Sequence, residues 1–254
     1  MNRRALIQVI LTVACVIGAS GLSATAAHAD EPHALWSGGT AYLTPPGRLE
    51  GNLLTPSRVA LSDQSELFMN IPLLALTPNL GYKRAHTLER SPLVISSRYR
   101  ANIPSLLRGF SSIERQPFLV TLDADLLVSA RLTERASILT FAIGTGWTPR
   151  FGRSIGFVDQ PSLLAPRVGN VPWAARARVR WDAVLVGELY YFLDTQLHVL
   201  PEAEFAQIEQ RLELSWRRRR VRVGVGVMAI GSVNKTGARS MSALPTIDAG
   251  VALD

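Results

Sequence analysis

The residues of this chain that could do chemistry are charged side chains at every second position of extended segments. Arg176, Arg178 and Arg180 alternate with alanine and valine, and a Glu–Arg–Glu series from Glu209 to Glu213 alternates with glutamine and leucine. Successive side chains of a β-strand point to opposite faces, so each run places its charges on one face. Such a face can pair carboxylates with guanidinium groups or bind anions.

The same alternation recurs along the chain, and we expect its polar face to line a lumen. The candidate lumen-lining residues are Glu50, Glu66, Lys83, Arg98, Arg100, Asp123, Asp125, Arg176, Arg178, Arg180, Glu188, Glu209, Arg211, Glu213, Arg222 and Asp248. Two interpretations stay open. The charges pair across strands and partly fill a narrow interior, or the arginines form one sector of a pore that favours anions.

Catalysis by a nucleophile needs a base beside it, and histidine is the usual one. Three histidines follow the first 29 residues, His33, His86 and His198, and no pair of them has metal-ligand spacing. We therefore expect no catalytic, cofactor-binding or metal site. The alternative of a barrel-embedded lipid enzyme requires His86 or His198 to meet a serine at the membrane face.

Two glycine-rich fragments resemble pieces of phosphate-binding loops. They are Gly144-Thr145-Gly146 and Gly224-Val225-Gly226. Both fall inside expected strands, where glycine permits close packing or tight curvature. We interpret them as packing positions.

The start of the chain has the three parts of a secretory signal peptide. Met1 to Arg4 is basic, Ala5 to Ile17 is apolar, and Ala27-His28-Ala29 supplies small residues for cleavage after Ala29. The apolar run is shorter than the roughly 20 residues of a spanning helix. We expect a signal peptide over 1–29 and one β-barrel domain over 30–254.

The elements that must position the charges are amphipathic strands. Phe118 to Leu132 is the cleanest, with apolar residues on one face and Asp123 and Asp125 on the other. Strands of about 9–11 residues with this alternation are typical of outer-membrane barrels. We predict an all-β, transmembrane antiparallel barrel in the outer membrane of a Gram-negative bacterium. A soluble periplasmic β-sandwich, serving as a binding module, is the alternative because its strands alternate in the same way.

Counting strands depends on where the turns fall. A split at Trp181-Asp182-Ala183 makes short and long connections alternate and gives eleven strands from Gly47 onward. Ala34 to Leu43 adds a twelfth. Ten strands is the alternative, if Ala34 to Leu43 is not a strand and Ala174 to Leu193 is unbroken.

Two hairpins follow from the parity of the apolar faces. A turn at Glu134-Arg135 places Leu139 opposite Ala130 and Phe141 opposite Val128. A turn at Arg218-Arg219 places Trp216 opposite Val221 and Leu214 opposite Val223. Pro201 to Leu212 also fits a helix, but we favour a strand from about Gln207.

The formal net charge is +7, with 27 basic and 20 acidic residues. A basic balance can indicate nucleic acid, but an exported protein has little access to it, and the arginines alternate with acids along strands. The expected partners are outer-membrane lipid and lipopolysaccharide, the barrel assembly machinery and small anionic solutes.

One stretch carries a resemblance to a known class. Thr40 to Gly51 includes Leu43-Thr44-Pro45-Pro46-Gly47, and Leu61-Ser62-Asp63-Gln64-Ser65-Glu66-Leu67 follows. Together they resemble the opening of small Gram-negative outer-membrane barrels loosely grouped as meta-pathway phenol-degradation-like transporters. Pro46 stands where lysine is usual in that class. Its barrels usually end in an aromatic residue, whereas this chain ends in Val251 to Asp254.

The resemblance implies a porin-like barrel, and its motifs mark no ligand. We expect a channel, transport-like or structural role without catalysis or cofactor, with the solute not written in the sequence.

Overall fold

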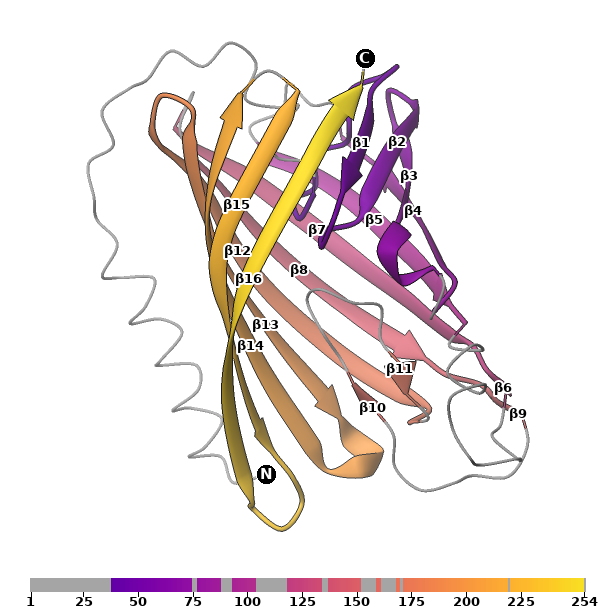
Figure 1. The fold of residues 1–254 in the computed structure, drawn as a ribbon. Helices are drawn as coiled ribbons and strands as arrows, with labels where there is room; N and C mark the ends of the chain where they lie inside the picture. The colour runs from indigo at the N-terminus through magenta and orange to yellow at the C-terminus, as the bar shows by residue number, and fades with distance from the viewer. Residues whose placement is uncertain are drawn as a thin grey trace.

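A computed structural model describes residues 38–74, 77–87, 93–103, 118–133, 137–151, 159–160, 168–169, 171–218 and 220–253. Twelve antiparallel strands of this part close a barrel (Figure 1). They are β1 (Leu49–Asn52), β2 (Ser57–Ser62), β3 (Ser65–Met69), β4 (Asn79–Ala85), β5 (Leu93–Asn102), β7 (Thr121–Thr133), β8 (Ser137–Trp147), β12 (Trp173–Val186), β13 (Leu189–Leu200), β14 (Phe205–Arg218), β15 (Val221–Val233) and β16 (Arg239–Leu253). The predicted all-β, twelve-stranded antiparallel barrel is confirmed.

Short elements decorate the connections between the barrel strands. Two-residue strands pair as β6 (Phe118–Leu119) with β9 (Arg150–Phe151), and as β10 (Asp159–Gln160) with β11 (Val168–Gly169). Single 3₁₀ turns occur at η2 (Ile71–Leu73) and η4 (Pro201–Ala203). No helix in the described ranges is both long and apolar enough to cross a bilayer.

The wall of the barrel is uneven. The first three strands have 4, 6 and 5 residues, whereas β14, β15 and β16 have 14, 13 and 15. The barrel closes where β1 pairs with the end of β16, from Leu49 opposite Leu253 to Asn52 opposite Gly250. The C-terminus therefore lies beside the first strand, as Figure 1 shows.

We name the two ends of the barrel by their connections. The turn end holds the β2–β3, β12–β13 and β14–β15 turns and the chain's C-terminus. The loop end holds the β13–β14 and β15–β16 connections and lies at the bottom of Figure 1.

The strand count of twelve is right, but two of its assignments are wrong. Thr40 to Leu43 forms no strand, and residues 34–37 of that predicted strand lie outside the described residues. The missing strand is β2, which occupies Ser57–Ser62. It begins directly after Pro56, a position where proline is tolerated because it lies just outside the strand.

The turn between the next pair of strands is also displaced. β12 and β13 are separate strands, so the unbroken run in the ten-strand alternative is wrong, but they turn at Gly187-Glu188 rather than at Trp181-Asp182-Ala183. Gly187 has φ of +53°, a left-handed conformation that glycine adopts at low cost. Since β13 then runs on to Leu200, the loop predicted from Asp194 to Ala206 shrinks to residues 201–204.

The two predicted hairpins have different outcomes. Ala130 lies opposite Leu139 and Val128 opposite Phe141, as expected, although residues 134–136 lie outside the described residues. In the other hairpin Trp216 lies opposite Val223, not Val221, because the turn falls one residue later and the register moves by two. A shift of two keeps every side chain on its predicted face. The strand interpretation after Pro201 is confirmed, since β14 begins at Phe205.

The two faces of the wall are opposite in character to those of a water-soluble fold. Leu126 is 43% exposed, whereas its neighbour Leu127 points inward and is 1% exposed. On β14 the leucines and Trp216 face outward while Glu209, Arg211 and Glu213 are buried. The outer surface is thus largely apolar, and the charged groups lie in the interior.

Candidate functional site

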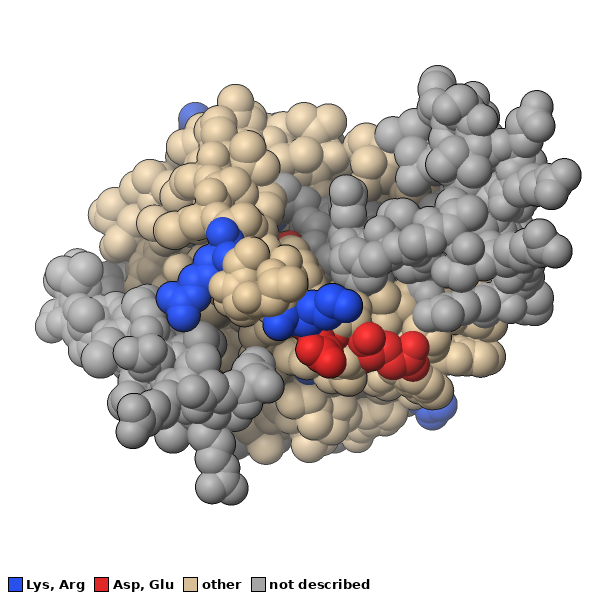
Figure 2. All heavy atoms as spheres, turned by 90° about the horizontal axis from the view of Figure 1, so that it is seen from below, with Lys and Arg blue, Asp and Glu red and all other residues tan. Residues whose placement is uncertain are grey.

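Of the sixteen predicted lumen-lining residues, all except Glu188 have buried or half-buried positions in the barrel. Glu188 is corrected. It lies in the β12–β13 turn with its side chain 50% exposed, 3.7 Å from the exposed Arg218. The reason is the displaced turn, which moves Glu188 out of the strand that was to aim it inward. Seen from the loop end, uncharged residues form most of the described surface, and few charged side chains reach it (Figure 2).

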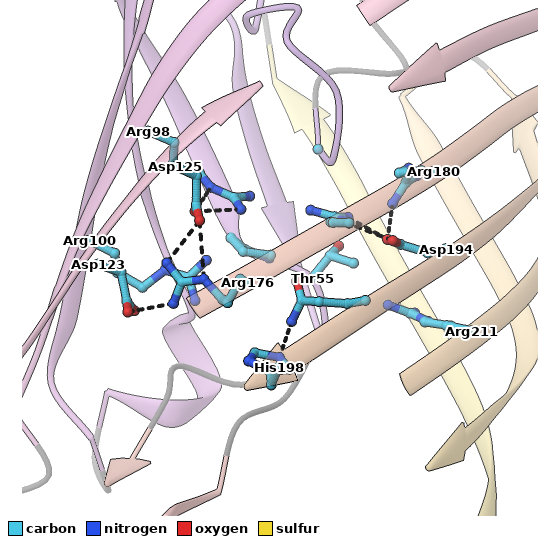
Figure 3. A pocket seen from close by; sticks show the side chains of 14 residues that line it. Thr55, Arg98, Arg100, Asp123, Asp125, Arg176, Arg180, Asp194, His198 and Arg211 are labelled. Carbon is cyan, nitrogen blue, oxygen red and sulfur yellow. Dashed lines mark hydrogen bonds and ion pairs between the residues drawn. The ribbon is translucent and has the colours of Figure 1, made fainter. Parts of the chain in front are cut away.

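The arginines predicted to form one sector do line one cavity. This cavity is open to solvent, and the free space between its lining residues, with the solvent opening included, is about 650 Å³. Figure 3 shows it from close by. Its lining residues are Gly38, Thr55, Pro56, Arg98, Arg100, Asp123, Asp125, Arg176, Arg178, Arg180, Asp194, Gln196, His198 and Arg211.

One cluster of ion pairs joins three strands that are not all neighbours. Arg98 of β5 donates to Asp125 of β7 through Nε and Nη2, at 3.0 and 2.8 Å. Arg176 of β12 donates to the other oxygen of Asp125 at 2.8 and 3.1 Å, and to Asp123 at 2.5 Å. Asp125 therefore holds two guanidinium groups at once.

Arg176 reaches β7 across the intervening strand β8 because Gly144 stands between them. Gly144 is the register partner of both Arg176 and Asp125. A Cβ at Gly144 would lie 1.9 Å from Asp125 Oδ1, inside the space that the carboxylate occupies. The Gly144-Thr145-Gly146 fragment thus lies inside β8, and Gly144 serves close packing there, as the sequence analysis predicts for this fragment.

A second cluster lies on β12 and β13. Arg178 pairs with Asp194, and Arg180 donates to Asp182 at 2.8 and 2.6 Å and to Asp194 at 3.3 Å. The guanidinium of Arg180 also lies 3.9 Å from the centroid of the Phe192 ring, a cation–π contact. Arg211 of β14 pairs with Glu213 on the same strand.

The interior is closed differently at the turn end. Residues 40–44 pass inside the barrel, where the Ala41 amide donates to Ser129 Oγ at 2.7 Å and Arg131 Nε donates to the Tyr42 hydroxyl at 3.1 Å. The Thr44 amide donates to Glu66 at 2.6 Å, and Lys83 donates to Glu66 at 3.2 Å and to the Tyr42 carbonyl. We call residues 38–44 the inner segment.

Apolar side chains surround the inner segment. Ala41 and Tyr42 are fully buried in one cluster with Val94, Leu127, Ile138, Ala142, Val184 and Tyr190. These residues come from β5, β7, β8, β12 and β13, so five strands pack on the inner segment. The turn-end half of the lumen therefore holds a packed apolar cluster, and the Lys83–Glu66 ion pair lies beside it.

Several interior residues escaped the sequence prediction. His198 lies on β13, buried beside Gln196. Arg58 pairs with Glu50 at 2.6 Å, and Asp182 and Asp194 each hold arginines. The same alternation marks these residues, but no strand was predicted at β2, and the turn between β12 and β13 was predicted too early in the chain.

A serine and a histidine meet at the turn end. His86, next after β4, lies with Nε2 2.9 Å from Ser97 Oγ of β5. His86 is exposed, and Arg84 is exposed beside it as the register partner of Ser97. His33 lies outside the described residues. A Gly-x-Ser-x-Gly sequence at residues 152–156 also lies outside them.

Within the described ranges, no group of three or more His, Cys, Asp or Glu side chains is placed to hold a metal ion. No family model matches the chain, and comparisons with curated proteins and with solved structures find no match either.

Proposed function

We propose that this chain is an exported outer-membrane β-barrel protein with a restricted, transport-like lumen for small solutes. The observation that carries the proposal is the two-faced wall: leucine, valine, isoleucine and tryptophan side chains face outward along the long strands while arginines and carboxylates fill the interior. Such a wall is stable when hydrocarbon surrounds it and water or paired charges lie within.

The two halves of the lumen give this proposal its direction. Solutes would enter the arginine-lined cavity from the loop end, and the inner segment with its apolar cluster would block the way to the turn end. In bacterial barrels short turns are periplasmic and long connections are extracellular. The cavity would then face outward from the cell and the inner segment would close the periplasmic side.

Lipid contact of the outer wall tests the membrane assignment. Spin labels at Leu126, Val128 and Leu214 should report oxygen accessibility typical of acyl chains after reconstitution, because these side chains point away from the lumen. A label at Leu127, which points inward, is the matched control and should report none. Labels at the outer positions that report a packed protein interior would refute the assignment.

Single-channel recording in planar bilayers tests the transport role. The intact chain should conduct weakly, and removal of residues 38–43 should raise its conductance several-fold because the apolar plug is lost. Substitution of the exposed Thr236 by alanine is the control and should leave conductance unchanged. A barrel that stays silent with and without residues 38–43 would be a structural protein instead.

The Ser97–His86 pair favours a second candidate, a barrel-embedded lipid hydrolase. A serine hydroxyl within 2.9 Å of an imidazole nitrogen is the arrangement that activates a nucleophile. Ser97 is the register partner of the outward-facing Leu126, so the pair lies on the outer side of the wall, where a lipid could reach it. Arg84 beside them would stabilise the negative charge of a tetrahedral intermediate.

Release of fatty acid from phospholipid vesicles tests this candidate. The hydrolase would lose activity in both Ser97→Ala and His86→Asn, and would keep it in Ser65→Ala, which removes a hydroxyl at an unrelated strand end. Equal release by the intact protein and the two variants would dispose of it.

A further inference from the structure

The arginine-lined cavity contains one cation that the ion-pair clusters leave over. Five of its arginines have carboxylate partners: Arg98, Arg176, Arg178, Arg180 and Arg211 pair with Asp123, Asp125, Asp182, Asp194 and Glu213. These five cations balance these five anions, and the set touches one further pair, since Arg211 lies 3.9 Å from Asp248 and Glu213 lies 3.9 Å from Arg222. Arg100, which also lines the cavity, adds a positive charge that this set does not neutralise.

The carboxylate nearest to Arg100 in the sheet is committed elsewhere. Asp123 is the register partner of Arg100 across β5 and β7. Its oxygens instead accept from Arg176 at 2.5 Å and from the Asn102 side chain at 3.3 Å. Among the described residues Arg100 has no hydrogen bond or ion pair, and in Figure 3 no dashed line reaches it.

An aromatic ring holds Arg100 in place. Its guanidinium lies 5.5 Å from the centroid of the buried Phe68 ring. Phe68 fits there because Gly81 is the register partner of both Phe68 and Arg100, and a Cβ at Gly81 would lie 2.1 Å from the ring. A cation–π contact is not a hydrogen bond to an acceptor atom, so the N–H donors of the guanidinium keep their capacity to bind a ligand.

We propose that Arg100 is the centre of an oxyanion-binding site in the lumen, taking a phosphate or carboxylate group of a small solute. The guanidinium fork matches the oxygens of both groups and can bind them with two hydrogen bonds. The cavity is open to solvent, which gives a small anion access to its lining residues. The bound anion would neutralise the surplus charge, which the paired arginines around it cannot do.

The site rests on the solute path proposed above, but its test does not need conduction. Folded protein in neutral detergent micelles is titrated with inorganic phosphate, and binding is followed by saturation-transfer ³¹P NMR. The intact protein should bind phosphate saturably, and Arg100→Gln should bind about tenfold more weakly or worse, since each lost charge-assisted hydrogen bond costs about one such factor. Arg239→Gln, the same charge change on the exposed start of β16, should bind as the intact protein does.

The outcomes separate cleanly. Equal phosphate affinity of the intact protein and Arg100→Gln, or no saturable binding by the intact protein, would overturn the site. If Arg100→Gln does not fold, the intact protein decides: phosphate should protect Arg100, and not Arg239, from modification by phenylglyoxal, and lack of protection would overturn the proposal. Phosphate binding can fail whether or not the barrel conducts ions. The titration therefore tests the site separately from the single-channel recordings.

The same titration also distinguishes a lipid headgroup from a free solute as the source of the oxyanion. Lysophosphatidic acid added to the micelles competes with inorganic phosphate if the site takes a lipid headgroup. An unchanged phosphate affinity assigns the site to free solutes, which its position inside the barrel favours.

Discussion

The interior of the barrel is filled differently at its two ends. At the turn end, the inner segment fills the space with Tyr42 and an apolar cluster drawn from five strands. At the loop end, a cavity remains, and its walls are arginines and carboxylates. The turn-end half thus combines an apolar cluster with ion pairs such as Lys83–Glu66, whereas charge pairing dominates the walls of the loop-end cavity.

The difference shows what each half can be used for. A packed core tolerates neither water nor ligand, because its interior has almost no free volume. Buried ion pairs contribute little net stability against apolar residues of the same shape, yet removing one partner is costly. The charged half is thus the part of the barrel that gives up stability for an interior able to receive a polar solute.

The largest effect should come from removing the shared carboxylate of the charged half. Asp125→Asn leaves both Arg98 and Arg176 without that partner, and we expect about 3–5 kcal/mol of destabilisation. Urea unfolding of the reconstituted protein, followed by tryptophan fluorescence, measures it. Asp63→Asn in the exposed β2–β3 turn is the control and should stay near the intact protein; similar losses in both would contradict the ion-pair account.

Truncation in the packed half should cost nearly as much. Leu127→Ala leaves a cavity against the inner segment, and we expect a loss of about 2–5 kcal/mol in the same unfolding experiment. Leu126→Ala on the adjacent outward position should cost less, because lipid tails fill the vacated space. A larger loss at Leu126 than at Leu127 would invert the two faces of β7.

A charged residue placed on the outer wall tests whether hydrocarbon surrounds the barrel. Leu126→Arg places a guanidinium in hydrocarbon and should cost about 2–4 kcal/mol if Leu126 lies near the middle of the bilayer. Leu61→Arg, at the rim of the turn end, should cost about 0–1 kcal/mol. Equal costs at the two positions would mean that no hydrocarbon surrounds this wall.

The smallest effect concerns the glycine that lets the charged cluster form. Gly144→Ala pushes a methyl group against Asp125 and should cost about 1–3 kcal/mol, as overpacking usually does. Gly51→Ala is the matched control, because its nearest neighbour would lie at 3.9 Å. Unfolding midpoints that move equally for both would show that Arg176 does not need the gap at Gly144.

The faces of the strands were predictable because strand alternation is local. Arg176, Arg178 and Arg180 could be assigned to one face from their spacing alone, and the structure brings them together with Arg98 and Arg100 around one cavity. The pairing of Arg176 with Asp125 could not be foreseen, since it crosses a third strand and depends on the register of both neighbours.

Chain ends and turns were less predictable for a related reason. Trp181-Asp182-Ala183 has the composition of a turn, but Asp182 faces inward and pairs with Arg180, which keeps β12 extended through it. Residues 40–43 alternate like a strand and yet lie inside the barrel, because packing on five strands outweighs local pattern. Neither outcome is visible without the closed sheet.

The shortness of β1 has a mechanical consequence. Two residue pairs join β1 to β2 and four join it to β16, while neighbouring strands such as β14 and β15 share thirteen. Under tension applied to the two chain ends, β1 should therefore detach first, and the opened sheet should then peel away hairpin by hairpin. Pairing of β1 with β16 would be the last event that turns an open sheet into a closed barrel.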